Sequence, residues 1–353
     1  MSDKTIHSVR IEPMGLEIEV EEGEWILDAV FRQGLAVPHG CREGRCSSCK
    51  CVLIEGDVEM EEYSTMALPD YERDGGQILL CRSHAYSDIT VELLNYDEEM
   101  MKYAVPVKKI SGELTSVTEL THDIRLLKVQ IESPMKFWAG QFVELGVPGA
   151  GVTRSYSMAS TPSSPTELQF IVRKYPEGAF SSLLDTTLTP GTPITVNGPF
   201  GSCLRREGRP GPMLLVGGGS GMSPLWSILQ DHIASGEQRP IRFFYGARAR
   251  RDLFLLDEFA AIAKSLPDFQ FIPVLSQAGP DDAWTGETGF VHEVLERVVR
   301  EQQLQGEPDA YTCGPVPMVD AVLPVLQELG VAPVNTFVDK FTPASATAPN
   351  LAH

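Results

Sequence analysis

The stretch Cys41-Arg42-Glu43-Gly44-Arg45-Cys46-Ser47-Ser48-Cys49 places three cysteines at the spacing C-x4-C-x2-C, and a fourth cysteine follows later in the chain. This spacing is typical of one class of 2Fe–2S cluster, in which four thiolates hold two irons. Gly44 allows the backbone to curl around a cluster, and the small residues Ser47 and Ser48 leave backbone N–H groups free to point at sulfur. The stretch therefore predicts a metal site whose ligands are Cys41, Cys46, Cys49 and Cys81.

Zinc is the alternative metal for such a set of cysteines. Structural zinc sites usually contain two C-x2-C pairs, whereas here a C-x4-C spacing replaces one of them. We therefore favour the iron–sulfur interpretation. The spare cysteines Cys51, Cys203 and Cys313 are odd in number, which indicates a reducing compartment rather than a disulfide framework.

Length and composition limit the class of protein. At 353 residues the chain is long enough for two or three domains. Hydrophobic residues make up 42% and charged residues 22%, as in globular proteins that fold in water. The N-terminus is polar without a signal peptide, and no apolar run approaches the ~20 residues that span a bilayer. We therefore expect a cytoplasmic protein that does not bind membranes.

Negative charge is concentrated in the first part of the chain. The net charge is −19, which argues against nucleic acid as a partner. Residues 1–103 contain 22 acidic and nine basic side chains, a balance of −13. Two interpretations stay open: a solvated acidic surface, or a docking face that steers this domain towards a positively charged protein. The candidate contributors are Glu55, Asp57, Glu59, Glu61, Glu62 and the run Asp97-Glu98-Glu99.

Residues 1–103 have the pattern of a β-grasp domain. Apolar and acidic residues alternate over 16–21, which is the period of a half-buried strand. The apolar residues that follow share one helical face, and Gly34 ends that helix. The predicted elements are a hairpin over 5–22, a helix from residue 25, and strands at 50–56 and 78–80, the last of which delivers Cys81.

Residues 104–208 predict a small antiparallel β-barrel, because short β-type runs alternate with Gly and Pro turns. The runs are 107–117, 124–131, 141–145, 155–159, 168–173 and 193–196. Arg154-Ser155-Tyr156-Ser157 lies in this segment. A loop that opens a short helix follows it, and its free N–H groups suit a pyrophosphate; its residues are Gly178, Ala179, Phe180, Ser181 and Ser182.

The 154–157 motif and the 178–182 loop together predict a binding site for FAD. Arg154 offers a guanidinium fork to the same phosphates. Tyr156 can pack against a flat ring, and Ser157 can form a hydrogen bond with the edge of that ring. An R-x-Y-S tetrapeptide alone is a weak signal, so the prediction depends on the loop that accompanies it.

Residues 209–341 alternate between β and α patterns, which predicts a parallel sheet covered by helices. An apolar strand runs into a glycine-rich turn that departs from the usual dinucleotide pattern G-x-G-x-x-G. The turn contains Gly217, Gly218, Gly219, Ser220, Gly221 and Pro224, the last of which stands where a helix residue is expected. Following a flavin-type barrel, the turn predicts a nicotinamide dinucleotide site. We expect the tail 342–353 to be disordered.

With these motifs placed in order, the chain resembles the ferredoxin–NADP reductase superfamily. More narrowly, it resembles the reductase components of bacterial soluble di-iron monooxygenases, such as those of propane or methane monooxygenase. The resemblance covers about residues 5–341. It rests on the cysteine loop with Cys81, the 154–157 and 217–224 motifs, Tyr245-Gly246-Ala247-Arg248, Cys313-Gly314-Pro315 and the closing Asp339-Lys340-Phe341.

The resemblance implies roles for the matching residues. Arg154, Tyr156 and Ser157 would hold FAD, with the 178–182 loop on its phosphates, and 217–224 would bind the NADH pyrophosphate. The residues implied near the reacting rings are Ser157, Cys313, Gly314, Pro315, Asp339 and Phe341. Relatives commonly have Glu where this chain has Asp339, which leaves its role open. The alternative for Cys313 is a buried strand cysteine.

The resemblance implies a multidomain α+β and α/β protein: a β-grasp 2Fe–2S ferredoxin domain (1–103), an antiparallel β-barrel FAD domain (104–208) and a parallel α/β NAD domain (209–341). Electrons would pass from NADH through FAD and the cluster to a di-iron hydroxylase. FAD stands between a two-electron donor and a one-electron acceptor. The sequence contains a single E-x-x-H match, at residues 119–122, rather than a pair of them, and no His cluster, so we expect the oxygen chemistry to belong to a partner oxygenase.

Two alternatives stay open: the reductase of an aromatic-ring hydroxylating oxygenase, and a non-catalytic electron carrier. NADH is expected rather than NADPH. A 2′-phosphate needs a basic pocket beyond the second strand of the nucleotide domain, and residues 246–252 offer three arginines there but also Asp252, which opposes a phosphate.

Overall fold

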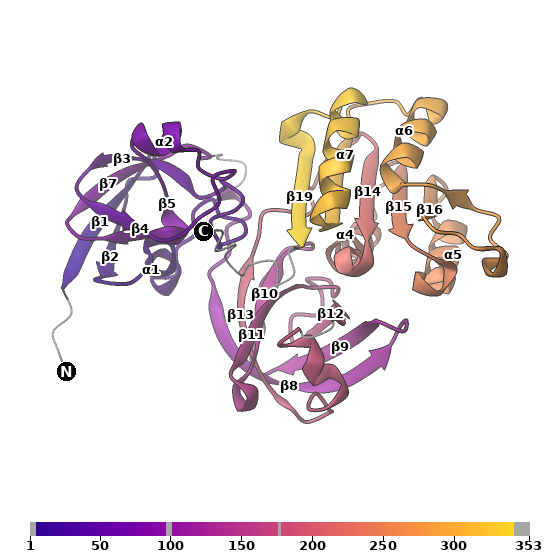
Figure 1. The fold of residues 1–353 in the computed structure, drawn as a ribbon, viewed down its shortest axis with the longest axis horizontal. Helices are drawn as coiled ribbons and strands as arrows, with labels where there is room; N and C mark the ends of the chain where they lie inside the picture. The colour runs from indigo at the N-terminus through magenta and orange to yellow at the C-terminus, as the bar shows by residue number, and fades with distance from the viewer. Residues whose placement is uncertain (1–4, 97–100, 176–177, 342–353) are drawn as a thin grey trace, which may run out of the picture. The chain divides into compact units, whose positions relative to one another are not determined.

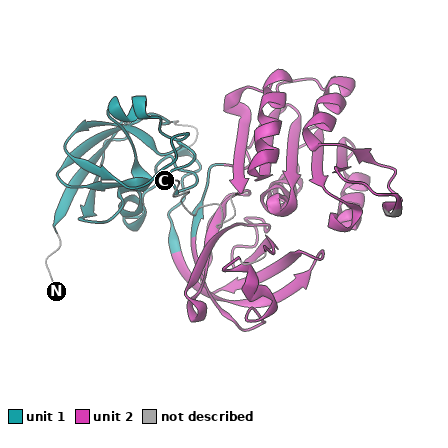
Figure 2. Cartoon of the chain, in the orientation of Figure 1, with its two compact units in different colours: residues 1–108, 198–202 teal, residues 109–197, 203–353 magenta. Residues whose placement is uncertain are grey.

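The computed structural model describes residues 5–96, 101–175 and 178–341, so the predicted tail 342–353 lies outside the described residues. The chain divides into two compact units (Figure 2). Residues 1–108 and 198–202 form the first unit, and residues 109–197 and 203–353 form the second. The domain boundaries at 103 and 208 remain predictions. No helix in the described part of the chain is long and apolar enough to cross a bilayer.

The first unit contains a five-stranded mixed sheet with the order β2-β1-β7-β3-β5 (Figure 1). Strands β1 and β2 form the predicted hairpin, and Ile18 and Val20 are buried as the alternation predicted. Parallel pairing of β1 with β7 completes a β-grasp sheet. The elements are β1 (Ile6–Glu12), β2 (Leu16–Glu21), α1 (Ile26–Arg32), β3 (Lys50–Glu55), β4 (Val58–Met60), α2 (Asp70–Asp74), β5 (Gln77–Leu79), β6 (Ser83–Ala85) and β7 (Ile89–Leu93).

The second unit begins with a six-stranded sheet of order β11-β10-β13-β8-β9-β12. An antiparallel bridge between Met158 and Phe170 joins the two outer strands and closes the sheet into a barrel. The short helix predicted after Gly178 is a five-residue 3-10 helix, Ser181–Asp185. The barrel strands are β8 (Lys108–Glu119), β9 (Ile124–Ile131), β10 (Phe142–Val147), β11 (Val152–Ser157), β12 (Glu167–Arg173) and β13 (Pro193–Phe200).

A parallel six-stranded sheet of order β17-β16-β15-β14-β18-β19 completes the second unit. Alternate residues of β14 pack into different cores: Met213 and Leu215 contact the α4–α5 side, and Leu214 and Val216 the α6–α7 side. The elements are β14 (Met213–Gly218), α4 (Met222–Ser235), β15 (Ile241–Ala247), α5 (Leu256–Ser265), β16 (Phe269–Leu275), β17 (Glu287–Thr288), α6 (Val291–Gln302), β18 (Asp309–Pro315), α7 (Val316–Glu328) and β19 (Thr336–Phe341). Strands β17 and β19 were absent from the sequence prediction.

Buried serines join helix α4 to the barrel. Ser223 Oγ donates to the backbone oxygen of Ser157 at 2.7 Å and accepts the Ile171 N–H at 3.2 Å. Ser227 Oγ donates to the backbone oxygen of Ser160 at 2.6 Å. Because buried polar groups need such partners, these bonds hold the start of α4 against strands β11 and β12. The R-S-Y-S motif and the glycine-rich turn therefore lie in one body.

Candidate functional site

The four predicted cysteine ligands come together in the first unit as two pairs. Cys49 Sγ lies 3.3 Å from Cys81 Sγ, and the Cys41 N–H donates to Cys46 Sγ at 3.2 Å. Backbone N–H groups of Glu43 and Arg45 donate to Cys41 Sγ at 3.4 and 3.2 Å. Donors of this kind stabilise thiolate ligands.

The pairing of the sulfurs fits two irons rather than one zinc ion. A tetrahedral zinc site with Zn–S bonds of about 2.3 Å would bring all four sulfurs within about 3.8 Å of one another. Among the described residues, the one group of three possible ligands whose atoms all lie within 4.8 Å of each other contains no cysteine. Two separate pairs match a 2Fe–2S cluster, in which each iron takes two thiolates. The residues therefore fit that group.

Close backbone approach shapes the loop that carries these cysteines. Gly44 has φ +69°, and a Cβ there would lie 2.8 Å from the Tyr63 and Arg82 side chains. A Cβ at Gly40 would lie 2.8 Å from Cys46 Sγ. Gly44 was predicted and Gly40 was not, because nothing in the local spacing marks the residue before the first ligand.

The R-S-Y-S motif lies on β11 beside the 178–182 loop. The Tyr156 and Phe180 rings pack with their centroids 4.8 Å apart, and burial raises the pKa of Tyr156 above its ordinary value. Arg154 is exposed, and its Nη1 donates to Thr153 O at 2.7 Å. Ser181 Oγ bonds to both the N–H and the carbonyl of Tyr175 at 3.0 Å. The Ser181 hydroxyl thus shapes the loop.

Three predicted residues from distant segments meet next to the barrel. Ser157 Oγ donates to Asp339 Oδ2 at 3.3 Å. Asp339 pairs with Cys313 across strands β19 and β18, and Phe341 pairs with Pro315 in the same ladder. Cys313 is fully buried, which raises the pKa of its thiol and keeps it protonated. The carboxylate of Asp339, whose role the sequence left open, therefore reaches Ser157.

The glycine-rich turn passes close to other backbone and side-chain atoms. A Cβ at Gly221 would lie 2.0 Å from the backbone oxygen of Cys313, and one at Gly218 would lie 2.7 Å from Met318 Sδ. Helix α4 begins at Met222, so Pro224 lies in its first turn. Proline is tolerated there because N–H groups of the first turn have no acceptor within the helix. Pro224 is therefore compatible with the helix that follows the turn.

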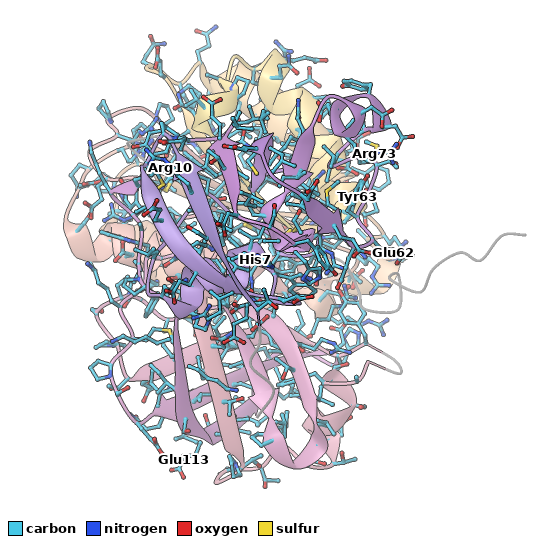
Figure 3. All side chains as sticks on the ribbon, turned by 90° about the vertical axis from the view of Figure 1, so that its left-hand side faces the viewer. His7, Arg10, Glu62, Tyr63, Arg73 and Glu113 are labelled. Carbon is cyan, nitrogen blue, oxygen red and sulfur yellow. The ribbon has the colours of Figure 1, made fainter. Side chains whose placement is uncertain are left out.

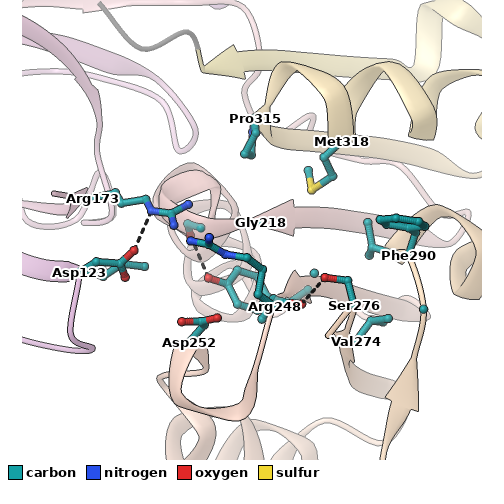
Figure 4. A pocket seen from close by; sticks show the side chains of 17 residues that line it. Asp123, Arg173, Gly218, Arg248, Asp252, Val274, Ser276, Phe290, Pro315 and Met318 are labelled. Atoms are coloured by element: carbon teal, nitrogen blue, oxygen red, sulfur yellow. Dashed lines mark hydrogen bonds and ion pairs between the residues drawn. The ribbon is translucent and has the colours of Figure 1, made fainter. Parts of the chain in front are cut away.

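A cavity of about 270 Å³ opens beside this turn (Figure 4). Gly218, Gly219 and Pro315 line it, as do Arg248 and Asp252. Asp252 Oδ2 also accepts the Ala249 N–H at 2.9 Å, which fixes the carboxylate. Arg250 donates instead to the backbone oxygen of Asp282 at 3.1 Å. Of the three arginines in residues 246–252, Arg248 lines the cavity, together with Asp252, which opposes a 2′-phosphate.

The cavity also contains residues that the sequence reasoning missed. Arg173 ends barrel strand β12, and its Nε donates to Asp123 Oδ2 at 2.9 Å (Figure 4). A Cβ at Gly219 would lie 3.4 Å from Arg173 Nη1, so the guanidinium reaches the turn. Met318 and Phe290 also line the cavity. In the sequence, the feature that could have drawn attention to Arg173 is a positively charged residue at the end of an apolar strand.

Three domain families match the chain. The 2Fe-2S iron-sulfur cluster binding domain matches residues 9–86, which contain all four ligand cysteines. The oxidoreductase FAD-binding domain matches residues 111–204, and the oxidoreductase NAD-binding domain matches residues 215–323. The protein is therefore an oxidoreductase with binding domains for a 2Fe–2S cluster, FAD and NAD.

Similar proteins share nearly the whole length of the chain. The reductase component of propane 2-monooxygenase from Rhodococcus jostii is 44% identical, over 95% of this chain and 91% of its own. The reductase component of phenol 2-monooxygenase from Pseudomonas sp. is 35% identical over 96% and 95%. The crystal structure of the Amycolatopsis cytochrome P450 reductase GcoB has a TM-score of 0.85 and 30% identity, and the match covers 96% and 99%. The chain belongs to the family of iron–sulfur flavoprotein oxidoreductases that includes the reductase components of bacterial monooxygenases.

Proposed function

We propose that this protein takes electrons from NADH and delivers them to the di-iron hydroxylase of a multicomponent monooxygenase that oxidises propane or a similar alkane. The observation that carries the proposal is the 44% identity to a propane 2-monooxygenase reductase component along almost the whole chain. Identity to the electron transfer component of toluate 1,2-dioxygenase is lower, at 32%. The alkane assignment is therefore favoured over the reductase of an aromatic-ring dioxygenase.

The residues of the second unit support the first half of this reaction. When bound, FAD supplies the conversion between two-electron and one-electron transfer. Arg154 and the 178–182 loop are the candidates for its phosphates, and Tyr156 and Ser157 for its ring. The turn 217–221 and Arg173 would hold the dinucleotide, and Asp252 favours a free 2′-hydroxyl over a 2′-phosphate.

Ser157, Asp339 and Cys313 would surround the reacting rings. Cys313 and Ser157 are buried, so they exclude water from the place where hydride moves. Asp339 accepts the hydrogen bond of Ser157, which orients the hydroxyl in the absence of substrate. We expect these three residues to position the flavin edge and the nicotinamide. The chain's free cysteines support a reducing, cytoplasmic environment.

The test is reduction of defined acceptors by the purified holoprotein with NADH. Ferricyanide would report flavin turnover, and the propane 2-monooxygenase oxygenase component of Rhodococcus jostii would report delivery to a hydroxylase. Propane hydroxylation in the combined assay supports the proposal. NADH–ferricyanide activity without any reduction of that oxygenase would contradict the partner assignment. Absence of both activities would indicate a non-catalytic carrier.

A further inference from the structure

A histidine of the barrel lies beside two carboxylates of the dinucleotide cavity. His122 lies in the turn between β8 and β9, and its side chain is 46% exposed. Its Nδ1 lies 3.7 Å from Asp252 Oδ1, and its Nε2 lies 3.9 Å from Asp123 Oδ1. Both carboxylates line the cavity, on the side where Arg173 lies (Figure 4), whereas His122 does not line it. His122 can therefore act on a bound dinucleotide through its neighbours.

Hydrogen bonds hold the turn that carries His122. Thr121 Oγ1 accepts the Ile124 N–H at 3.1 Å and donates to Asp123 Oδ1 at 3.1 Å. Arg125 Nη1 donates to the backbone oxygen of Thr121 at 2.7 Å. The imidazole is therefore attached to a fixed turn, and its place beside the cavity follows from the packing of the barrel on the nucleotide-binding sheet.

The two carboxylates differ in how their charge is balanced. Asp123 Oδ2 accepts a charge-assisted hydrogen bond from Arg173 Nε at 2.9 Å. Asp252 Oδ2 instead accepts the neutral Ala249 N–H at 2.9 Å. Within the described ranges of the chain, His122 is the only basic side chain at ion-pair distance from the Asp252 carboxylate. The charge of Asp252 is therefore balanced at close range only when His122 carries a proton.

Protonation decides whether His122 acts on Asp252. Separations of 3.7 and 3.9 Å are longer than hydrogen bonds, so the interaction is one of charge. Imidazole is the side chain whose charge ordinarily changes between pH 5 and 8, whereas carboxylate and guanidinium groups ordinarily keep their charges over that range. The charged groups on the surrounding elements are Glu119, Asp123, Arg125, Arg173, Arg248 and Asp252. The charge that changes beside Asp252 is therefore that of His122.

We propose that His122 is a specificity-determining residue, whose protonation cancels the charge of Asp252 and lowers the discrimination against a dinucleotide that carries a 2′-phosphate. The inference rests on the proposed function, in which Asp252 favours a free 2′-hydroxyl. When His122 is neutral, the Asp252 carboxylate repels a 2′-phosphate. When His122 is protonated, the pair is neutral, and Arg248 in the same cavity can attract the phosphate. The protein therefore accepts NADPH more readily as the pH falls.

The test measures the ratio of kcat/KM for NADPH to kcat/KM for NADH, with ferricyanide as acceptor, from about pH 8 to about pH 6. A phosphate monoester also takes up a proton near pH 6, so the ratio rises for the wild type and for the variants alike, and the measure is the difference between wild type and His122→Gln. The ratio should rise about threefold more in wild type, the size expected of a half-exposed ion pair. His122→Lys should raise the ratio about threefold at pH 8, because its cation is permanent.

Two further comparisons separate this role from a structural one. In an Asp252→Ala background, His122→Gln should leave the ratio unchanged at every pH, because the proposed effect passes through Asp252. His7→Gln is the matched control, since His7 is a half-buried imidazole on β1 of the first unit (Figure 3), whereas the cavity belongs to the second. The control should reproduce the wild-type pH profile. FAD content and cluster absorbance show that each variant is folded.

Identical pH profiles of the ratio in wild type and His122→Gln would overturn the proposal. An effect of His122→Gln that persists in the Asp252→Ala background would overturn it as well. A wild-type preference for NADPH would defeat the assignment of NADH, and the two pH profiles would still decide the role of His122. Failure to reduce the oxygenase would refute the partner assignment alone, because ferricyanide is the acceptor in this comparison.

Discussion

Replacing Arg173 with Ala should weaken NADH binding. The Arg173 guanidinium comes from the barrel, is oriented by Asp123 at 2.9 Å, and reaches the glycine-rich turn of the nucleotide domain. A cation at this turn can bind the phosphates of a dinucleotide through charge-assisted hydrogen bonds. Ala removes that group and leaves the backbone of the turn unchanged.

The expected loss of NADH binding free energy follows from how far the ion pair of Arg173 and Asp123 is buried. A hydrogen bond to a charged group contributes about 1.5–3 kcal/mol. The side chains of Arg173 and Asp123 are 21% and 20% exposed, so solvent screens the interaction and the lower end applies. About 1.5 kcal/mol corresponds to roughly a tenfold fall in kcat/KM. The fall in kcat/KM should come from a higher KM with kcat unchanged, because the phosphates are remote from the reacting atoms.

Steady-state oxidation of NADH with ferricyanide measures both constants. Arg173→Lys should lie between wild type and Ala, because it keeps the charge and loses the planar fork. Arg250→Ala is the control, since Arg250 bonds to Asp282 and does not line the cavity. An Arg173→Ala variant with unchanged KM, or with the loss confined to kcat, would refute the reasoning.

Three further predictions concern the cluster, the choice of dinucleotide and the partner. Cys46→Ser should abolish the cluster's visible absorbance while NADH–ferricyanide activity stays largely intact, because the ligand belongs to the first unit and the flavin residues to the second; joint loss of both would contradict this separation. Wild type should have a higher kcat/KM with NADH than with NADPH. Asp252→Ala should raise kcat/KM for NADPH about tenfold by removing the carboxylate that opposes a 2′-phosphate beside Arg248, and a wild-type preference for NADPH would show the assignment to be wrong. Electron delivery to the oxygenase should slow steeply as salt shortens the Debye length from ~10 Å at 0.1 M to ~3 Å at 1 M, while NADH reduction of the flavin changes little. If delivery is insensitive to salt, the acidic residues of the first unit serve solubility only.

The structure refines the acidic docking face predicted from composition. Glu61 is bonded to Arg82 Nη2 at 2.8 Å and to His84 Nε2 at 3.0 Å, so part of its charge is already balanced. These bonds lower the pKa of Glu61, with the His84 bond as the largest cause. The run Asp97-Glu98-Glu99 lies outside the described residues. We therefore expect other exposed carboxylates, such as Glu92, to contribute more to steering.

Local patterns alone predicted the main elements. The spacing of the cysteines identified the cluster ligands, alternation over 16–21 identified a strand, and the apolar run before Gly217 identified the central strand of the nucleotide domain. These signals are readable because each depends on neighbours in the chain, through the period of a strand or helix. Strand β17 was missed because two residues are too few to show a period, and the six-residue strand β19 was missed as well.

The arrangement around the reacting centre was decided by tertiary structure. Ser157 and Asp339 are 182 positions apart, and they meet because β19 pairs with β18 while α4 is bonded to β11. Arg173 was an ordinary strand residue in the sequence until the packing of barrel and sheet brought it to Gly219. The sequence by itself determined which residues can bind iron, flavin or phosphate, because those chemistries belong to side-chain types and local spacing. Which of them act together depends on strand pairing and buried hydrogen bonds between distant segments, and these form only in the folded chain.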